Sequence, residues 1–546
     1  TILYEENIAP RRMRLHQQVA QVLEEVYANR LQDHAGELAD HFSYSTETSD
    51  LTKAVHYGEM AARQALAVYA HGERVRLLEH VLKVQEVLNP NDIEKRCDLL
   101  RRLSDALTIS GEPRRALDME LPEAFTLAES INDNYRASRV CLYAMIALAN
   151  YGTTLAADTP EFAKWVERAD RYAPPDTVER AWADAFKGTM YCVKGRHEEG
   201  VEFLSRAVTL SRKLGKPNPY WMSVHMYSQY AAAPKRLEER LLLAEELASI
   251  PRTGIDTATL GTALFHMGST FLEAGKRDKA EELFNEMKDL SERSARPMLE
   301  LLVLRGDLYL ATLDGRLEEA VETSQKMQST GEEVGLSEFA TAAAAYFNLT
   351  PYIHTGKYEE AYQLAQLLPP VPSMVASVFC LAHMGRKEEA NRILEELVVE
   401  PSVTGTEDEE TPAYILAVLL DAAVATNHVK AAEILLKRLS GTDVQSTSYF
   451  CMTCILRHLG AAASLTNKPE DARDYYREAL EVSTNMNFRP ELALTRLEIA
   501  ELLLKHFPDE KAEAVQHLDF AIKEFREMNM QPSLNRSLEH KDILKA

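Results

Sequence analysis

Hydrophobic residues recur along this chain with the period of an α-helix. Apolar side chains recur every three or four positions within successive segments, and short polar stretches separate one segment from the next. A repeat of 3.6 residues is the mark of an amphipathic helix, whereas a half-buried strand repeats every two residues. The pattern therefore predicts a chain built of helices with negligible strand.

A short phrase recurs where one predicted helix gives way to the next. It consists of a turn residue, charged residues and then a small residue. The clearest copies are GRHEEG (195–200), GKRDKA (275–280), GRLEEA (315–320), GKYEEA (356–361) and GRKEEA (385–390), with weaker copies at 111–116, 235–240, 427–432 and 467–472. Successive copies settle about 40 residues apart, and a shared interval is the signature of a repeat architecture. A string of unrelated helical hairpins would not keep one interval over so many copies.

Each phrase has the composition of a joint between two helices. The glycine can adopt the left-handed conformation that ends the first helix. The acidic pair then falls in the first turn of the second helix, where the helix dipole favours negative charge. The small last residue allows the two helices to approach closely. The sequence therefore predicts about 11–12 helix pairs of one kind.

The residues around the joint resemble the tetratricopeptide repeat, which has a small residue and an aromatic in its first helix and a small–aromatic–small pattern in its second. The matching sets are Gly188, Tyr191 and Gly195 with Gly200, Leu204 and Ala207; Gly268, Phe271 and Gly275 with Ala280, Phe284 and Met287; and Gly460 with Ala472, Tyr476 and Ala479. The resemblance implies an all-α fold, a right-handed superhelix or solenoid of helix pairs. The expected array covers residues 65–546, and its period of about 40 residues is longer than the usual ~34.

Two stretches are expected to interrupt the array. Near 367–385, Pro369, Pro370 and Pro372 forbid a continuous helix, so one helix there must be short or the stack must bend. Near 400–412, the acidic run TGTEDEETP is expected to be a solvated loop.

The beginning of the chain differs in style from the array. Its segments are RLHQQVAQVLEEVY (14–27), HAGELADHF (34–42) and KAVHYGEMAARQALAVYA (53–70). Over residues 10 to 85 it resembles the region that joins an ATPase core to its helical arm in bacterial signal-transducing (STAND-type) ATPases, such as the LuxR-type large transcriptional regulators and their nucleotidyl-cyclase-linked relatives. The matching positions are Leu15, His16, Val19, Ala20, Glu37, Leu38, Ala39, His41 and Phe42. The resemblance implies that residues 1–64 are a helical connector to an ATPase module upstream of Thr1, in a bacterial protein.

Composition and charge limit the classes of protein further. The 546 residues exceed what one hydrophobic core usually holds. With 61 Lys and Arg against 84 Asp and Glu, the formal charge is −23, and such a chain repels the phosphate backbone of nucleic acids. Six scattered cysteines are too few for a disulfide framework and suggest a reducing compartment. No signal peptide or membrane span is evident, so a cytoplasmic protein without a direct nucleic-acid or membrane partner is expected.

The sequence contains none of the common catalytic motifs. The phosphate loop G-x-x-x-x-G-K-[ST] is absent, as are G-x-S-x-G, H-E-x-x-H and G-x-G-x-x-G. The sequence therefore predicts no cofactor and no catalytic residue, and any ATPase or cyclase activity would lie in the upstream module.

Two groups of residues have the spacing of metal ligands. Cys451-x-x-Cys454 is a half-site without a second pair nearby, and as part of a repeat helix it is better explained by two small buried side chains. His34, Glu37 and His41 share one helical face, but the family resemblance explains them by packing and capping. No metal site is predicted.

The best binding candidate is the concave groove that the first helices of such an array line. Between Tyr220 and Tyr230, the segment YWMSVHMYSQY concentrates aromatic and polar side chains, and its Trp221, His225 and Gln229 share one helical face. The register of the repeats places further residues on the same surface: Arg305, Tyr309, Tyr346, Asp421 and Arg457. Packing between repeats would explain the individual aromatic residues, but large side chains with polar ends also suit ligand contact.

These observations predict a non-catalytic sensor arm that binds a protein, a peptide or a small effector in its groove and controls an upstream ATPase-type signalling module. Two alternatives remain open. A stand-alone tetratricopeptide scaffold for protein assembly would have no upstream ATPase. An enzyme with a dispersed, motif-less site would have a deep closed pocket instead of an open groove.

Overall fold

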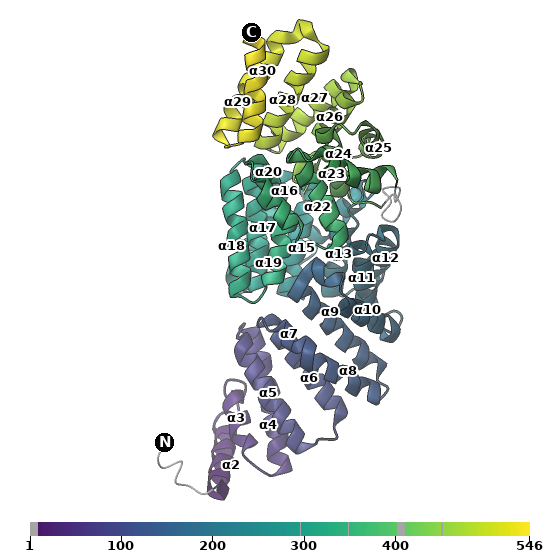
Figure 1. Ribbon diagram of the computed structural model, residues 1–546. Helices are drawn as coiled ribbons and strands as arrows, with labels where there is room; N and C mark the ends of the chain where they lie inside the picture. Colours follow the sequence, from purple (N-terminus) through teal and green to yellow (C-terminus); the bar gives the residue numbers. More distant parts are fainter. Residues whose placement is uncertain (1–8, 295, 348, 401–409, 449–450, 546) are drawn as a thin grey trace. The chain divides into compact units, whose positions relative to one another are not determined.

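The computed structural model describes residues 9–294, 296–347, 349–400, 410–448 and 451–545. In these ranges the fold is all-α apart from one small antiparallel sheet, in which β1 (Ser446–Thr447) pairs with β2 (Thr453–Cys454). The chain divides into two compact units, Thr1–Tyr151 with Pro160–Ala183 and Gly152–Thr159 with Asp184–Ala546. Helix pairs of the kind that the sequence predicts recur along the chain (Figure 1).

The first unit contains the helices from α2 to α10. Their bounds are α2 (Ala9–Val26), α3 (Ala35–Ser43), α4 (Thr48–Ala67), α5 (His71–Leu88), α6 (Ile93–Ile109), α7 (Pro113–Arg115), the π-helical turn η1 (Ala116–Glu120), α8 (Leu121–Ser130), α9 (Asn134–Ala157) and α10 (Pro160–Tyr172). The last residues of α9 belong to the second unit. The boundary expected between residues 64 and 65 lies inside α4.

The second unit contains a longer series of helix pairs. Their bounds are α11 (Val178–Val193), which begins in the first unit, α12 (His197–Leu214), α13 (Pro217–Tyr230), η2 (Pro234–Arg236), α14 (Leu237–Ser249), α15 (Thr257–Glu273), α16 (Arg277–Ser294), α17 (Pro297–Leu313), α18 (Leu317–Glu333), α19 (Ser337–Phe347), α20 (Leu349–His354), α21 (Tyr358–Ala365), α22 (Pro370–His383), α23 (Lys387–Leu394), η3 (Glu395–Val399), α24 (Ala413–Thr426), α25 (Val429–Leu439), α26 (Ile455–Leu465), α27 (Pro469–Asn485), α28 (Arg489–His506), η4 (Pro508–Glu510), α29 (Lys511–Glu527) and α30 (Gln531–Lys545). The all-α, tetratricopeptide-like class predicted from the sequence is confirmed.

The joints between paired helices have the geometry that the recurring phrase predicts. The glycines that begin the five clearest phrases have φ between 73° and 79°, in the left-handed region: Gly195, Gly275, Gly315, Gly356 and Gly385. Asn427 and Asn467 adopt the same conformation in two weaker copies. The acidic pair falls in the first turn of the second helix in α12, α18, α21 and α23.

A small residue in the first helix and a large one in the second bring paired helices together. A Cβ atom added to Gly188 would lie 2.7 Å from Cγ of Leu204, and one added to Gly460 would lie 2.6 Å from the ring of Tyr476. A Cβ at Gly268 would clash with the ring of Phe284. The two members of each contact are sixteen residues apart in the sequence. One spacing therefore sets the approach of the helices in three separate repeats.

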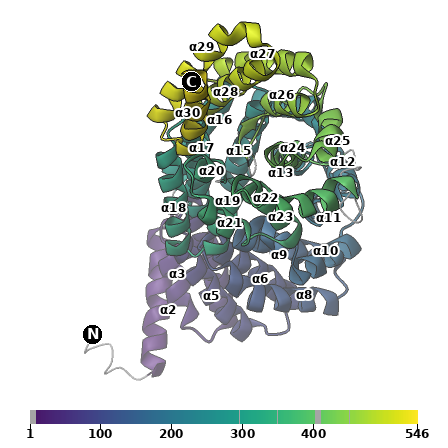
Figure 2. The same ribbon diagram turned by 45° about the horizontal axis from the view of Figure 1, so that its top comes forward.

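Successive superhelical turns of the second unit contact each other (Figure 2). The backbone N–H of Ala413, at the start of α24, donates to the carbonyl of Ala232 after α13 at 2.8 Å. Beside this bond, the Arg236 guanidinium pairs with the buried carboxylate of Glu410 at 2.7 Å. The stack therefore curves enough for helices five pairs apart to touch.

The helices that follow in each of the two turns are also in contact. The N–H of Gln445 donates to the carbonyl of Glu273 at 2.8 Å, and Arg277 donates to the carbonyls of Met486 and Asn487 at 3.1 Å each. Partners across the turns are 172 to 210 residues apart. With a period of about 40 residues, one superhelical turn holds about four to five repeats.

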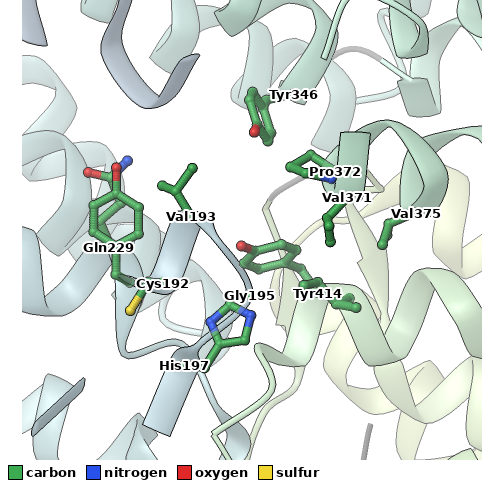
Figure 3. A pocket seen from close by; sticks show the side chains of 12 residues that line it. Cys192, Val193, Gly195, His197, Gln229, Tyr346, Val371, Pro372, Val375 and Tyr414 are labelled. Carbon is green, nitrogen blue, oxygen red and sulfur yellow. The ribbon is translucent and has the colours of Figure 1, made fainter. Parts of the chain in front are cut away.

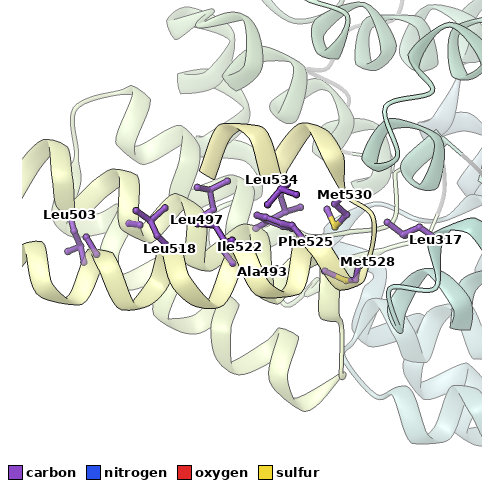
Figure 4. Packing of buried hydrophobic residues seen from close by; sticks show 14 residues of the cluster. Leu317, Ala493, Leu497, Leu503, Leu518, Ile522, Phe525, Met528, Met530 and Leu534 are labelled. Atoms are coloured by element: carbon purple, nitrogen blue, oxygen red, sulfur yellow. The ribbon is translucent and has the colours of Figure 1, made fainter. Parts of the chain in front are cut away.

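Near the end of the chain, a hydrophobic cluster joins the last helices to α18. Leu317 at the start of α18 is fully buried in a cluster whose other members come from α28, α29 and α30 and from the joint between the last two. Figure 4 shows Leu317 beside Met528 and Met530, and Phe525 lies among the same side chains. Burial of apolar surface therefore joins Leu317 to residues 176 to 217 positions further along the chain.

Of the two stretches expected to interrupt the array, the one near 367–385 agrees with the prediction and the one near 400–412 differs from it in part. In keeping with the proline run, α21 is short and ends at Ala365, and α22 begins at Pro370. Residues 401–409 of the acidic stretch lie outside the described residues. The expectation of a solvated loop is wrong for Glu410 at its end, which is buried because Arg236 and Lys235 pair with it.

The prediction of a helix around Cys451 and Cys454 is also wrong for its first residues. Thr453–Cys454 forms β2, and α26 begins only at Ile455. Thr447 and Thr453 pair in the small sheet, and the Thr453 hydroxyl bonds to buried polar groups. Both cysteines are buried, as expected.

The close approach of α11 and α12 yields a direct test. A Cβ at Gly200 would collide with the Cys192 thiol and lie 2.8 Å from the carbonyl oxygen of Gly188. Because the backbone would have to move, Gly200→Ala should lower the free energy of unfolding by about 1–3 kcal/mol in chemical denaturation. In the control Gly72→Ala, the added Cβ meets nothing within 4 Å, so stability should be unchanged or rise by up to about 1 kcal/mol. Equal effects of the two substitutions would contradict this packing.

Candidate functional site

The eight residues predicted to line the groove all lie in the second unit, on the first helices of their pairs. Trp221, His225 and Gln229 are on α13, Arg305 and Tyr309 on α17, Tyr346 on α19, Asp421 on α24 and Arg457 on α26. The structure brings them together in three separate places. These are an aromatic layer, a small cavity and a buried charged network.

The aromatic layer holds four of the eight residues. Trp221 is fully buried, with the Arg252 guanidinium 5.1 Å from its ring. His225 is half-buried and stacks on the ring of His266 from α15, with 5.9 Å between the centroids. Among the described residues, the Nδ1 atom of His225 is buried without a hydrogen-bond partner, and burial lowers the pKa of the His225 imidazole to about 4. These side chains fill space between neighbouring repeats.

Arg305 and Tyr309 complete the same layer. The Arg305 guanidinium lies 4.1 Å from the ring of Phe265. The ring of Tyr309 lies 5.6 Å from the same Phe265 ring, measured between centroids. Both side chains are buried. A cation over an aromatic face and a tilted ring pair are stable packing arrangements in an interior. The layer is therefore part of the core between α15 and α17.

Gln229 and Tyr346 line a cavity that we call the inner cavity (Figure 3). Its described lining residues come from the joint of α11 and α12, the end of α13, α19 and the starts of α22 and α24: Cys192, Val193, Gly195, His197, Gln229, Tyr230, Tyr346, Val371, Pro372, Val375, Tyr414 and Ile415. Figure 3 shows Gln229 and Val193 on one side and Val371, Pro372 and Val375 on the other, with Tyr346 and Tyr414 between them. Two superhelical turns meet in this cavity.

The inner cavity is small and its lining is neutral. Its volume is about 60 Å³. No Lys, Arg, Asp or Glu is among the described residues that line it. Three phenols, one carboxamide, one imidazole and one thiol supply the polar groups, and aliphatic side chains form the rest of the wall. Few, well-placed polar groups in an apolar wall are typical of binding pockets.

Arg457 is the centre of a buried ionic network. Its guanidinium donates to Glu491 at 2.7 Å and to Glu498 at 2.8 Å, and both carboxylates come from α28. The Thr453 hydroxyl donates to Glu491 at 2.8 Å. All four side chains are buried. The arginine is therefore fully engaged by the protein itself.

Asp421 extends this network toward α22. Its carboxylate lies 2.6 Å from Nε2 of His383 and 3.5 Å from Nδ1 of the buried His458. The Arg457 network consists of His383, Asp421, Thr453, Arg457, His458, Glu491 and Glu498. It connects α22, α24, β2, α26 and α28, so five elements share one set of charges.

The charges in the network shift the pKa values of its members. Burial alone would raise the pKa of Glu491, but the Arg457 charge outweighs it and leaves that pKa lowered. For Asp421, burial would likewise raise the pKa. The His383 charge outweighs this effect, so the pKa of Asp421 is also lowered. Burial dominates for Glu498 and raises its pKa. Three carboxylates therefore share one arginine and a histidine.

The residues considered for metal binding do not converge. His34 contacts Glu37 at 3.2 Å, whereas His41 faces His16 on α2 at 2.6 Å. Across the part of the chain that the structure describes, no group of three or more His, Cys, Asp or Glu side chains is arranged to hold a metal ion. None of the helices in these same ranges is long and apolar enough to cross a membrane.

Sequence reasoning missed much of both the cavity and the network. Tyr414 lines the cavity but follows directly on the acidic stretch that was expected to be a solvated loop. Glu491 and Glu498 are seven residues apart on one face of α28, but the helix also carries Arg496, Glu501 and Lys505, so the pair gave no distinct signal in the sequence. His383 carried no signal beyond its place at the end of a hydrophobic helix.

Comparison with known proteins adds a resemblance in fold. No protein-family model matches the chain, and no curated protein matches it in sequence. Among solved structures, the crystal structure of the APC/C hetero-tetramer Cut9–Hcn1 is similar to it, with 14% identity and a TM-score of 0.48 over 95% of this chain and 96% of that chain. At this level the similarity carries no argument about function. The class that the chain's own geometry defines is an all-α, tetratricopeptide-like solenoid.

The Arg457 network yields a stability prediction. Arg457→Met would leave two buried carboxylates without their cation, so the free energy of unfolding should fall by about 3–5 kcal/mol in chemical denaturation. The control is Arg477→Met on α27, because Arg477 and its partner Asp474 are largely exposed, with 71% and 66% of their side chains accessible. This control should change stability by no more than about 0.5 kcal/mol. A similar small loss in both variants would show that Arg457 is not a structural residue.

Buried neutral histidines yield a prediction of pH dependence. Burial lowers the pKa of His225, His354 and His458 to about 4, against about 6.5 in an unfolded chain. As the pH falls from about 6.5 to 4, the unfolded state takes up protons that the folded state does not, so the free energy of unfolding should fall. Glu498, with its raised pKa, acts in the opposite direction at the acidic end. Urea midpoints measured between pH 7.5 and 5 should decrease with pH, and less steeply in His225→Leu. A flat profile would contradict the burial of these rings.

Proposed function

We propose that the chain is the non-catalytic regulatory arm of a signalling protein. It binds a protein partner or effector on the inner side of its solenoid and controls an ATPase-type module that docks on helix α2. The observation that carries this proposal is the orientation of α2, whose apolar face is turned away from the rest of the first unit.

The outward face of α2 is a hydrophobic stripe. Leu15, Val19, Val22 and Val26 are 44%, 41%, 56% and 67% exposed. Their spacing of four, three and four residues places them on one side of the helix, in the pattern of a seam between packed helices. Covering each side chain would stabilise a complex by roughly 1 kcal/mol. Such a face is typical of a contact with another folded module.

The inward face of α2 is polar for a helix that packs on its own domain. Gln17 donates to Asp50 at 2.7 Å, and Glu24 accepts from Lys53 at 2.6 Å and from the Tyr57 hydroxyl at 2.5 Å. Ala20 is the fully buried apolar residue on this side. Because α2 uses polar bonds inward and presents valines outward, we propose that its main hydrophobic partner lies outside the described residues.

The occupant proposed for the stripe is the ATPase-type module that the resemblance of residues 10–85 implies. Two of the four stripe residues, Leu15 and Val19, are among the positions that carry this resemblance. The helix also begins close to the start of the chain, so a module preceding it would be held near the stripe at high effective concentration.

The proposed control is a shift between conformations. The inner cavity is lined by residues of two superhelical turns, so a partner bound there contacts both turns at once. A partner that binds one curvature of the solenoid more tightly than another shifts the population toward that curvature. The arm would transmit this shift to the docked module.

Site-specific photo-crosslinking would test the docking face. p-Benzoylphenylalanine placed at Val22 in the full-length protein, expressed from its own gene, should form cross-links to peptides that precede Thr1 in the same polypeptide. The matched control is the same residue placed at Gln21, which is exposed on the polar flank of α2 and should cross-link several-fold less. Mass spectrometry identifies the peptides.

Two outcomes would contradict the proposal. Cross-links from Val22 to a separate protein would favour a stand-alone scaffold. Equal yields at Val22 and Gln21 would show that the stripe has no specific partner.

A further inference from the structure

We infer that the inner cavity binds one uncharged group about the size of a single side chain, which both donates and accepts hydrogen bonds. A primary carboxamide is the simplest group of this class. The inference rests on the proposed binding role of the inner side and names the chemistry recognised there.

The charge of the described lining favours an uncharged ligand. A charged group that leaves water for a site without an opposite charge loses several kcal/mol, and no Asp, Glu, Lys or Arg is among the described lining residues. The acids and the arginine of the Arg457 network are bonded to one another and line a different part of the unit. A neutral ligand therefore fits the described lining best.

The size of the cavity excludes a large ligand. Pockets for drug-sized molecules measure about 300–1,000 Å³, whereas this cavity measures about 60 Å³. That volume is enough for a few water molecules or for one small side chain. The ligand is therefore a small molecule of a few heavy atoms or one residue of a peptide.

Gln229 determines the hydrogen-bonding character of the ligand. Its side chain is half-buried in the wall, and among the described residues it forms no hydrogen bond with another protein group. A carboxamide offers both donors and acceptors. The Tyr346 and Tyr414 phenols flank the same space (Figure 3) and can do likewise. A ligand with both donors and an acceptor fits this wall better than a hydrocarbon, which would leave Gln229 without a partner.

The position of the cavity explains why one small group would matter. Gln229 belongs to one superhelical turn and Tyr414 to the next, and the backbone bond from Ala413 to Ala232 holds the two turns together beside them. A group that bonds to both side chains adds a second link between the turns.

Binding of matched amides and acids would test this inference. Saturation-transfer NMR with propionamide and with propionate detects the free small molecule, and the blocked residues N-acetylglutamine methylamide and N-acetylglutamate methylamide represent a peptide source. Wild-type protein should give signals for the amides and none for the acids. A stronger signal from the blocked glutamine than from propionamide would indicate a peptide ligand, and the reverse a free metabolite.

Two variants locate the signal. Gln229→Leu should weaken amide binding by about two- to tenfold, the loss expected for one neutral hydrogen bond. The control Gln363→Leu, on the exposed side of α21, should leave binding unchanged. Unchanged unfolding midpoints in both variants would confirm that the fold is intact.

The inference is overturned if propionate and propionamide give equal signals, or if Gln229→Leu binds amides as wild type does. Neither result affects the cross-links from Val22, so a failure here leaves the proposed docking of α2 open to its own test.

Discussion

Contact between successive superhelical turns determines what the second unit presents to its surroundings. In a simple solenoid each repeat touches only its neighbours, and the concave side stays open. Here the hydrogen bond from Ala413 to Ala232, the Arg236–Glu410 pair and the Arg277 bonds to Met486 and Asn487 join repeats that are far apart in the sequence. These contacts therefore add walls to the inner side that a simple solenoid lacks. On the surface that was expected to form an open groove, residues of two turns line a cavity of about 60 Å³.

The local architecture could be predicted from the sequence because its causes are local. A glycine with positive φ, an acidic pair in the next turn and a small residue facing a large one sixteen positions later are all short-range features. Gly195, the acidic pair that follows it, and Gly188 facing Leu204 show them in one repeat. Contacts between turns could not be predicted, since they depend on the curvature summed over four or five repeats. A few degrees of difference at each joint would place Glu410 against other partners or in solvent.

The same distinction applies to the candidate site. The register predicted which helix faces Arg457, Asp421, Gln229 and Tyr346 would occupy, but not whether each side chain would find a partner within the protein. Arg457 and Asp421 do, because Glu491, Glu498 and His383 come from elements whose position the sequence did not reveal. Such a buried network contributes little net stability but disfavours other packings of the helices, which would leave its charges unpaired. Gln229 has no such partner within the described ranges, and this difference separates a structural polar residue from a candidate for recognition.

The segment between α25 and α26 has a consequence for how the protein is made. The N–H of Gln445 donates to the carbonyl of Glu273, and the Ser446 hydroxyl donates to the neighbouring carbonyl of Leu272. A ribosome that adds about 5–20 residues per second needs roughly 10 to 30 s to go from the end of α15 to this segment. During that interval the end of α15 lacks its final partners, including the cover over the buried Arg240–Glu273 pair. The end of α15 is thus completed only after residues 172 positions later have been made, and until then it would be open to a chaperone that acts during synthesis.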